Sequence, residues 1–320
     1  MELPEKRIQY PQIARDQHPV AGNQPLAVAN GDHVYWDLDT ALKYRRDPAR
    51  RAATEAQYRQ IAWIDQDLAF DSETNRRSIN TIAGRQIASI YEDRFASVPL
   101  VFITDDHDYY ENDNAGPWGY SLPPRPFIFG LQQQTAALAY PIALGRPDWG
   151  NPYEAGTVET VRVGNLLEIA LFDCRRGWST GADAGVLFPK AEAFLIERLR
   201  ASTAKQYIHA PSNPFGWTAG KLGEWYADGP SETSAFDNDK GYWQQGWFEQ
   251  HQRLAAALSA QKERAAISIS GDMHASAISR ITRSGDLDLS ANPVHTILPG
   301  TIGTGTPGFP SSVRGVFPWH

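Results

Sequence analysis

The stretch LVFITDDHDYYENDNAG, residues 100–116, runs from an apolar segment directly into a cluster of acids around one histidine. Residues 98–104 are apolar and rich in β-branched side chains, which is typical of a buried strand. The segment that follows holds four Asp, one Glu, two Asn and one His. Carboxylates this close together repel one another unless a positive charge lies among them. The stretch therefore predicts a buried strand that ends at a cationic centre.

The whole chain has the composition of a globular α/β protein. Of its 320 residues 42% are apolar and 21% charged, and the net charge of −7 disfavours binding to nucleic acid. Cys174 is the single cysteine, which excludes an intrachain disulfide and a zinc site built on cysteines. No apolar run is long enough to span a membrane, and the first residues lack the apolar region of a signal peptide. We expect one domain over 1–320, with an irregular or truncated segment at 1–24 and a Gly/Pro-rich tail at 299–320.

Strands alternate with helices along most of the chain, and strands cluster towards its end. The apolar and alternating segments predict strands at 25–32, 98–104, 157–163, 166–172, 205–210, 265–270, 276–282, 287–291 and 294–298. Helical spacing predicts helices at 40–64, 73–96, 125–141, 189–200 and 239–262. The strands at 157–163 and 166–172 are joined by Gly-Asn, which indicates a hairpin. This order favours an α/β domain in which a sheet packs on a sheet and helices lie outside.

Four of the expected strands end in polar signatures, at 29–37, 103–108, 207–211 and 269–276. Ligands of open α/β sheets bind outside the carboxyl ends of strands, so we expect these four ends to converge. Convergence would bring together Asp32, Tyr35, Asp106, His107, His209, Asp272 and His274. Carboxylate, imidazole and phenolate ligands suit iron, manganese, zinc or calcium. The cationic centre is therefore expected to be a pair of metal ions.

Each signature also has a simpler interpretation when it is taken alone. A Gly-Asp pair after a strand is commonly a turn, and adjacent acids at a strand end can cap a helix or face solvent. His209 within a strand is also typical of a core histidine, and Tyr35 of a core aromatic. The order of the four signatures and their strand context favour the metal site over these alternatives.

The order Gly-Asp-x-x-Tyr, Asp-Asp-His-Asp, Gly-Asp-x-His resembles the calcineurin-like metallophosphoesterase superfamily, and more closely its PhoD-like alkaline phosphatase/phosphodiesterase branch. The segments that carry the resemblance are NGDHVYWD (30–37), ITDDHDYYENDNAG (103–116), ALFDCRRGW (170–178) and SGDMHAS (270–276). It covers roughly residues 26–285. The resemblance implies a β-sandwich of two mixed sheets flanked by helices, with a dinuclear metal centre at one edge.

The resemblance also implies a set of metal ligands. They are Asp32, Tyr35, Asp106, Asn112, Asp272 and His274. Asp32 would be shared by both ions, and Tyr35 would bind a ferric ion. Asn112 is an alternative to Asp106 as the ligand at one position. Iron(III) with calcium is the implied pair, and manganese or zinc would also fit these ligands.

Other residues take catalytic or supporting roles by the same resemblance. His107 would bind no metal and would act as general acid or charge stabiliser at the leaving-group oxygen, with Asp108 holding its ring. A metal-bound hydroxide would attack phosphorus. Arg175 and His209 would contact the phosphate or the metal ligands. The implied reaction is hydrolysis of a small-molecule phosphate monoester or diester.

The chain departs from the family pattern before Asp32. The superfamily's first metal-ligand motif lies on an earlier strand, and residues 1–31 contain no apolar strand that ends in Asp-x-His. We therefore expect a truncated chain, a mis-assigned start or a missing ligand set. A truncated chain would belong to an exported protein and a complete one to the cytoplasm, so the compartment stays open.

Two alternatives to the phosphoesterase follow from these residues. The first is a degenerate, non-catalytic relative that binds a ligand or partner, because the first ligand motif is missing. The second is another metal hydrolase or oxygenase, because His209, His274 and Asp32 could supply the two imidazoles and one carboxylate of a ferrous site.

Overall fold

The structure is a computed structural model that describes residues 26–34, 64–65, 67–91, 98–109, 126–139, 149–179, 183–219, 245–261, 263–272, 276–300 and 313–315. The helices and strands of its first half are β1 (Ala27–Asn30), α3 (Glu73–Tyr91), β2 (Leu100–Ile103), the 3-10 helix η3 (His107–Tyr109), α4 (Pro126–Ala139), β3 (Val158–Val163) and β4 (Leu167–Phe172). Those of its second half are α5 (Pro189–Ala201), β5 (Gln206–Pro211), β6 (Trp217–Ala219), α6 (Gln245–Ser259), β7 (Ala266–Ile269), β8 (Ser276–Ile281), β9 (Arg283–Ser284), β10 (Leu287–Asp288), β11 (Val294–Pro299) and β13 (Val313–Gly315).

The larger sheet has six strands in the order β3-β4-β5-β7-β11-β8. The four central strands run parallel, and β3 and β8 lie antiparallel at the two edges. The β3–β4 hairpin pairs Val158 with Phe172 and Val163 with Leu167, which confirms the hairpin expected from the sequence. α5 connects β4 to β5, and α6 lies between β5 and β7, as parallel neighbours require. The carboxyl ends of the central strands therefore meet at one edge.

A second sheet packs on the larger one and completes the sandwich. Its described strands are β1 and β2, which run parallel with Ala27 opposite Leu100 and Asn30 opposite Ile103. An apolar layer joins the two sheets, and it consists of Val101, Ile103, Leu171 and Ala210 with the half-buried Leu26, Val28, Val161 and Ile169. The expected fold class, an α/β sandwich of two sheets flanked by helices, is confirmed.

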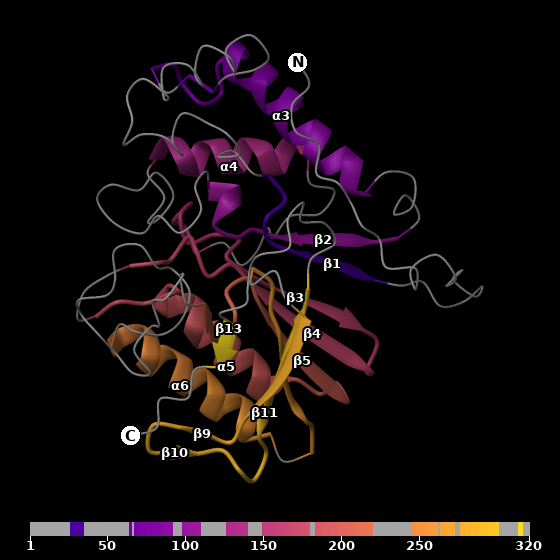
Figure 1. Cartoon of the computed structure of the whole chain (residues 1–320), viewed down its shortest axis with the longest axis vertical. Helices are drawn as coiled ribbons and strands as arrows, with labels where there is room; N and C mark the ends of the chain where they lie inside the picture. The colour runs from indigo at the N-terminus through magenta and orange to yellow at the C-terminus, as the bar shows by residue number, and fades with distance from the viewer. Residues whose placement is uncertain are drawn as a thin grey trace.

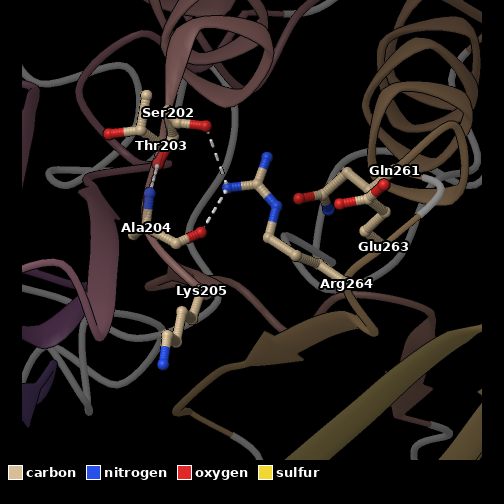
Figure 2. A pocket seen from close by; sticks show the side chains of 7 residues that line it. All are labelled: Ser202, Thr203, Ala204, Lys205, Gln261, Glu263 and Arg264. Carbon is tan, nitrogen blue, oxygen red and sulfur yellow. Dashed lines mark hydrogen bonds between the residues drawn. The ribbon is translucent and has the colours of Figure 1, made fainter.

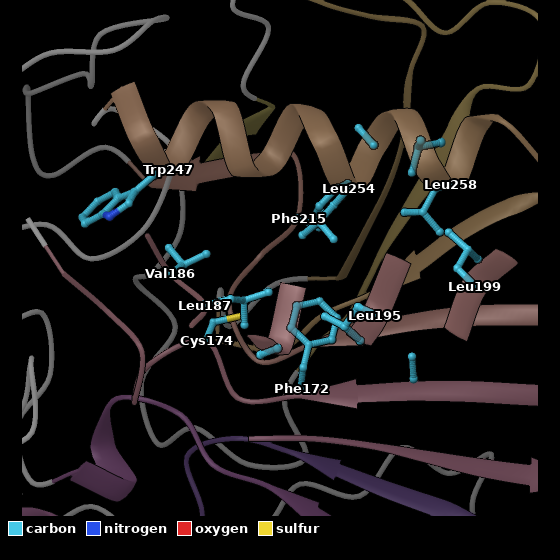
Figure 3. Packing of buried hydrophobic residues seen from close by; sticks show 14 of the residues in the cluster. Phe172, Cys174, Val186, Leu187, Leu195, Leu199, Phe215, Trp247, Leu254 and Leu258 are labelled. Atoms are coloured by element: carbon cyan, nitrogen blue, oxygen red, sulfur yellow. The ribbon is translucent and has the colours of Figure 1, made fainter. Parts of the chain in front are cut away.

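Helices cover both outer faces of the sandwich (Figure 1). α3 and α4 pack on the small sheet, where Ile79, Ala83 and Ile87 of α3 are buried at helical spacing. α5 and α6 pack on the larger sheet, and Figure 3 shows the buried side chains between them, including Phe172, Leu195, Phe215 and Leu254. The chain thus forms four layers: helices, sheet, sheet, helices.

Several expectations from the sequence differ from the structure, and others concern residues that the structure does not describe. The expected strand at 287–291 is only the two-residue β10, because it pairs in a tight turn with β9. Within the expected tail, β13 pairs with β6, so the tail contributes a strand. The expected helix at 40–64 lies outside the described residues except for Ile64, and the single domain stays a prediction. None of the helices in the described part of the chain has the length and apolarity needed to cross a membrane.

Candidate metal centre

The carboxyl ends of strands from both sheets meet at one place. After β1, the Asn30 side-chain amide donates to the Pro211 carbonyl at the end of β5, 2.9 Å away. Gly271 after β7 lies so close to β1 that a Cβ there would be 2.5 Å from the Asn30 carbonyl oxygen. After β2, the Thr104 hydroxyl donates to Asp173, which follows β4, at 2.7 Å. The convergence expected from the four polar signatures is therefore present for β1, β2, β5 and β7, and β4 joins them.

The two Gly-Asp pairs at these ends share an unusual backbone conformation. Asp32 has a φ of 56° and Asp272 a φ of 71°, so both lie in the left-handed region that non-glycine residues rarely adopt. Gly31 also has a positive φ, and a Cβ there would be 2.5 Å from the Cβ of Asp105. Such conformations cost about 1–3 kcal/mol each and concentrate at functional sites. The backbone strain therefore marks the same edge as the acidic side chains.

The acidic residues form two groups that could each hold a metal ion. One group is Asp32, Asp106 and His107, and the other is Asp105, Asp106 and Asp272. Within each group one ligand atom from every residue lies within 4.8 Å of the others, and Asp106 belongs to both groups. Carboxylate and imidazole donors of this kind suit iron, manganese, zinc and calcium. The donor set therefore fits the two adjacent ions that the sequence predicts.

Asp105 provides the second observation in favour of a cation. Its side chain is fully buried, and its Oδ2 atom has no hydrogen-bond partner among the described residues. Burial is the largest cause that raises the pKa of this carboxyl well above its ordinary value, and Arg175 opposes it. Three more carboxylates raise this pKa further: Asp272, Asp106 and Asp32. A buried carboxylate surrounded by other carboxylates is stable as an anion only with cations beside it.

Arg175 supplies one positive charge to the cluster. Its Nε donates to Asp105 Oδ1, and its Nη2 lies 3.3 Å from Asp272 Oδ2. The side chain of Arg175 is fully buried. The expected contact of Arg175 with metal ligands is thus compatible with the structure, whereas its contact with phosphate stays a prediction.

Asp108 holds the loops of the centre together. Its Oδ1 accepts hydrogen bonds from the backbone N–H groups of His33 at 3.0 Å and Val34 at 3.1 Å. Its Oδ2 accepts from the N–H of Asp105 at 2.9 Å. Asp108 therefore ties the loop after β1 to the loop after β2, a role that the sequence does not indicate. Its expected support of the His107 ring stays a prediction.

His107 is buried within the centre, and its backbone N–H donates to Asp106 Oδ1 at 2.9 Å. Its ring belongs to the group of Asp32 and Asp106, so the geometry also allows it to bind a metal ion. The resemblance implies instead that it is a general acid. Both roles need the ring where the structure places it.

A buried hydrogen-bond network positions the turn that carries Arg175. Asp173 accepts from the N–H groups of Arg175 at 2.7 Å and Arg176 at 3.1 Å. Its other oxygen accepts from the hydroxyl of Tyr109 at 2.5 Å and from that of Thr104 at 2.7 Å. The roles of Asp105, Asp173 and Tyr109 were not predicted from the sequence, although all three residues lie within the quoted motifs.

His209 lies in an aromatic cluster on the helix-covered side of the larger sheet. Its ring centroid is 4.4 Å from that of Phe172 and 5.9 Å from that of Phe215, and Phe215 also contacts His251 at 4.3 Å. Burial lowers the pKa of both histidines to about 3, and the charge of His251 contributes to the shift of His209. His209 therefore has the environment of a neutral core histidine, and its contact with phosphate stays a prediction.

Three expected ligands, Tyr35, Asn112 and His274, lie outside the described residues. Among the described residues, neither ligand group contains His209. The alternative of a ferrous site built on His209, His274 and Asp32 stays a prediction, because His274 lies outside the described residues.

The pocket in Figure 2 lies at the other end of the larger sheet. It is lined by Ser202, Thr203, Ala204, Lys205, Gln261, Glu263 and Arg264, next to the residues where β5 and β7 begin. The Arg264 guanidinium donates to the carbonyls of Leu199, Ser202 and Ala204, so it caps the end of α5. The pocket is thus a gap between helix ends and does not belong to the acidic centre.

Comparisons with known proteins agree with this architecture. No family model and no curated protein matches the chain. A solved structure described as "Structure of PhoD" is similar in fold, with a TM-score of 0.50 and 16% sequence identity. The similarity covers 90% of this chain and 59% of that chain. The chain therefore has a PhoD-like fold.

Proposed function

We propose that the chain hydrolyses phosphate esters with the help of metal ions bound at the converging strand ends. The observation that carries the proposal is the pair of ligand groups that share Asp106. Two adjacent ions are the arrangement that phosphoryl-transfer enzymes use to act on both the attacking and the leaving oxygen. The PhoD-like fold supports the proposal, and the sequence motifs support membership of the PhoD-like phosphatase/phosphodiesterase branch.

The residues that would hold the ions are the four carboxylates of the two groups: Asp32, Asp105, Asp106 and Asp272. Tyr35, Asn112 and His274 would add ligands according to the sequence motifs. Iron(III) with calcium is the proposed pair, and manganese or zinc is compatible with the same donors. Bound ions of this kind stabilise charge on phosphoryl oxygens and make water more acidic.

The remaining residues orient the centre and move protons. Asp108 fixes the loops after β1 and β2 through three backbone N–H groups. His107 would hold a proton at a ring nitrogen and give it to the leaving-group oxygen as general acid. Arg175 would hold Asp105 and Asp272 in fixed positions through its ion pairs. We propose a small-molecule phosphate ester as substrate, because the net charge of −7 disfavours nucleic acid.

One observation favours a non-catalytic relative as the second candidate. Arg175 already pairs with Asp105 and Asp272, so part of the negative charge is neutralised without metal. A protein of this kind would bind a ligand at the same edge without turning it over.

The test compares hydrolysis of p-nitrophenyl phosphate and bis(p-nitrophenyl) phosphate by the wild-type chain, Asp106→Asn and Asp286→Asn. Asp286 is exposed in the turn between β9 and β10, so its variant controls for the loss of one carboxylate. We expect Asp106→Asn to lose more than roughly 100-fold in turnover, because residues that merely orient metal ligands already cost about 10–100-fold. If the wild-type chain hydrolysed neither ester with iron, calcium, manganese or zinc, the non-catalytic alternative would be favoured.

A further inference from the structure

We propose that Arg175 is a resident counter-ion of the metal centre, which holds the carboxylates of the centre together before a metal ion binds. The inference rests on the proposed function, since it concerns the same centre and its two ions. It goes further by assigning to Arg175 a contribution to the stability of the metal-free chain, which a metal ion takes over when it binds.

The first observation is the crowding of carboxylates at the centre. Asp32, Asp105, Asp106 and Asp272 supply ligand atoms to two groups that share Asp106, and the ligand atoms of each group lie within 4.8 Å of one another. Carboxylates at such distances repel one another, and burial strengthens the repulsion because water no longer screens it. The centre therefore needs positive charge even when no metal ion is bound.

The backbone leaves these carboxylates little room to move apart. A Cβ at Gly31 would lie 2.5 Å from the Cβ of Asp105, and a Cβ at Gly271 would lie 2.5 Å from the carbonyl oxygen of Asn30. Each of these two glycines directly precedes an Asp of the centre, so the loops that carry these carboxylates pack closely on their neighbours. The repulsion must therefore be balanced by a cation, because moving the loops apart would break this packing.

Arg175 brings a positive charge to the centre from a third strand end. It follows β4, whereas Asp105 follows β2 of the small sheet and Asp272 follows β7. Its Nε donates to Asp105 Oδ1, and its Nη2 lies 3.3 Å from Asp272 Oδ2. The three side chains are at most 2% exposed, so salt and water screen these ion pairs little. Because arginine stays protonated in proteins, this charge is present with or without a metal ion.

The position of Arg175 is set by protein contacts alone. Its backbone N–H donates to Asp173 Oδ1 at 2.7 Å. The other oxygen of Asp173 accepts from the hydroxyl of Thr104 at 2.7 Å and from that of Tyr109 at 2.5 Å. Thr104 and Tyr109 lie on either side of Asp105 in the sequence. The turn that carries Arg175 is therefore tied to the segment that carries its partner.

The ion pair leaves an oxygen of Asp105 for a metal ion. Arg175 contacts Oδ1, whereas Oδ2 is buried and has no hydrogen-bond partner among the described residues. An ion could bind Oδ2 while Oδ1 keeps its contact with the guanidinium, so the counter-ion is compatible with two metal ions. A bound ion would itself balance the carboxylates, and the stability of the chain would then depend less on Arg175.

The first test uses the wild-type chain, in chelator and then with saturating Mn²⁺. Circular dichroism would report secondary structure, and tryptophan fluorescence would follow urea unfolding. We expect native secondary structure and a cooperative urea transition in chelator, and a higher urea midpoint with Mn²⁺. A wild-type chain that unfolds in chelator and folds again with Mn²⁺ would contradict the inference, because its carboxylates would then depend on the metal ion alone.

The second test compares Arg175→Gln with Arg198→Gln in the same two media. Arg198 forms an ion pair with the buried Glu168 away from the centre, so its variant is the matched control. In chelator we expect Arg175→Gln to lower the folding equilibrium constant by more than about 100-fold, because it leaves buried carboxylates without their partner. With Mn²⁺ this loss should shrink by at least about 10-fold, because the ion supplies the missing charge. The loss in Arg198→Gln should be the same in both media.

Equal losses in Arg175→Gln with and without Mn²⁺ would overturn the inference and leave the proposed function intact, provided that Mn²⁺ stabilises the wild type. No stabilisation of the wild type by Mn²⁺ would overturn the proposed function as well. If Arg175→Gln folds in neither medium, the double variant Asp105→Asn with Arg175→Gln decides. It removes one carboxylate together with the counter-ion, so it should fold in chelator. A double variant that stays unfolded would show that Arg175 is needed for packing and not for its charge, against the inference.

Discussion

The buried pair His209 and His251 should make the chain markedly less stable in mild acid. Both rings lie in the aromatic cluster around Phe215, and burial lowers the pKa of each to about 3 from an ordinary value of 6.5. In the folded chain both rings stay neutral down to about pH 3, whereas in the unfolded chain both take up a proton below about pH 6.5. The unfolded state therefore binds more protons in this window, and the free energy of unfolding falls as the pH falls through it.

The size of the effect follows from the two pKa values. For one histidine with these values, the free energy of unfolding decreases by about 2 kcal/mol between about pH 8 and about pH 5. The two histidines together contribute about 4 kcal/mol, which is a large part of the 5–15 kcal/mol typical of a folded protein. His209→Gln should remove about half of this decrease, and His251→Gln the other half.

The assay is urea unfolding followed by tryptophan fluorescence at the two pH values, with a chelator present so that metal release does not contribute. His295→Gln is the control, because His295 is half-buried on β11 and lies outside the aromatic cluster. The control should keep the full wild-type decrease. If His209→Gln and His251→Gln both kept the pH dependence of the wild type, the two buried histidines would not be its cause.

Two further predictions concern the loops of the centre. Gly31→Ala should destabilise the chain by about 1–3 kcal/mol more than Gly164→Ala in urea unfolding. Both glycines have a positive φ, so the cost of that conformation cancels, but only at Gly31 would a Cβ lie against Asp105. Equal losses of stability would contradict this close approach. Tyr109→Phe should lower the free energy of unfolding by about 1–3 kcal/mol, because it removes a hydrogen-bond donor from the buried Asp173 carboxylate. An unchanged urea midpoint would show that this hydrogen bond does not stabilise the chain.

The sequence predicts the layers and the polar edge well because both depend on local patterns. Apolar runs mark the strands, helical spacing marks α3, α5 and α6, and the Gly-Asn turn marks the β3–β4 hairpin. The polar residues at strand ends predict their convergence, because parallel strands must bring their carboxyl ends to one edge.

The contacts inside the centre could not be predicted in the same way. Asp105 and Arg175 are 70 residues apart, and their contact depends on how the two sheets pack. Asp108 reaches His33 across 75 residues, and this contact depends on the pairing of β1 with β2. The burial of Glu168 could not be predicted from the sequence either. Glu168 interrupts an apolar strand, yet it is fully buried because Arg198 and Ser202 at the end of α5 bind its carboxylate. Pairings of this kind are set by tertiary structure and leave no local pattern.

Asp106 is the residue that both ligand groups share, so its substitution should weaken metal binding at the whole centre. The metal-free wild-type chain, Asp106→Asn and Asp286→Asn would each be titrated with Mn²⁺ by isothermal titration calorimetry, and circular dichroism would confirm that all are folded. We expect the wild type and Asp286→Asn to bind Mn²⁺ with the same affinity, and Asp106→Asn to lose at least about 10–100-fold in affinity. Equal binding by all three folded chains would contradict a metal centre at the converging strand ends.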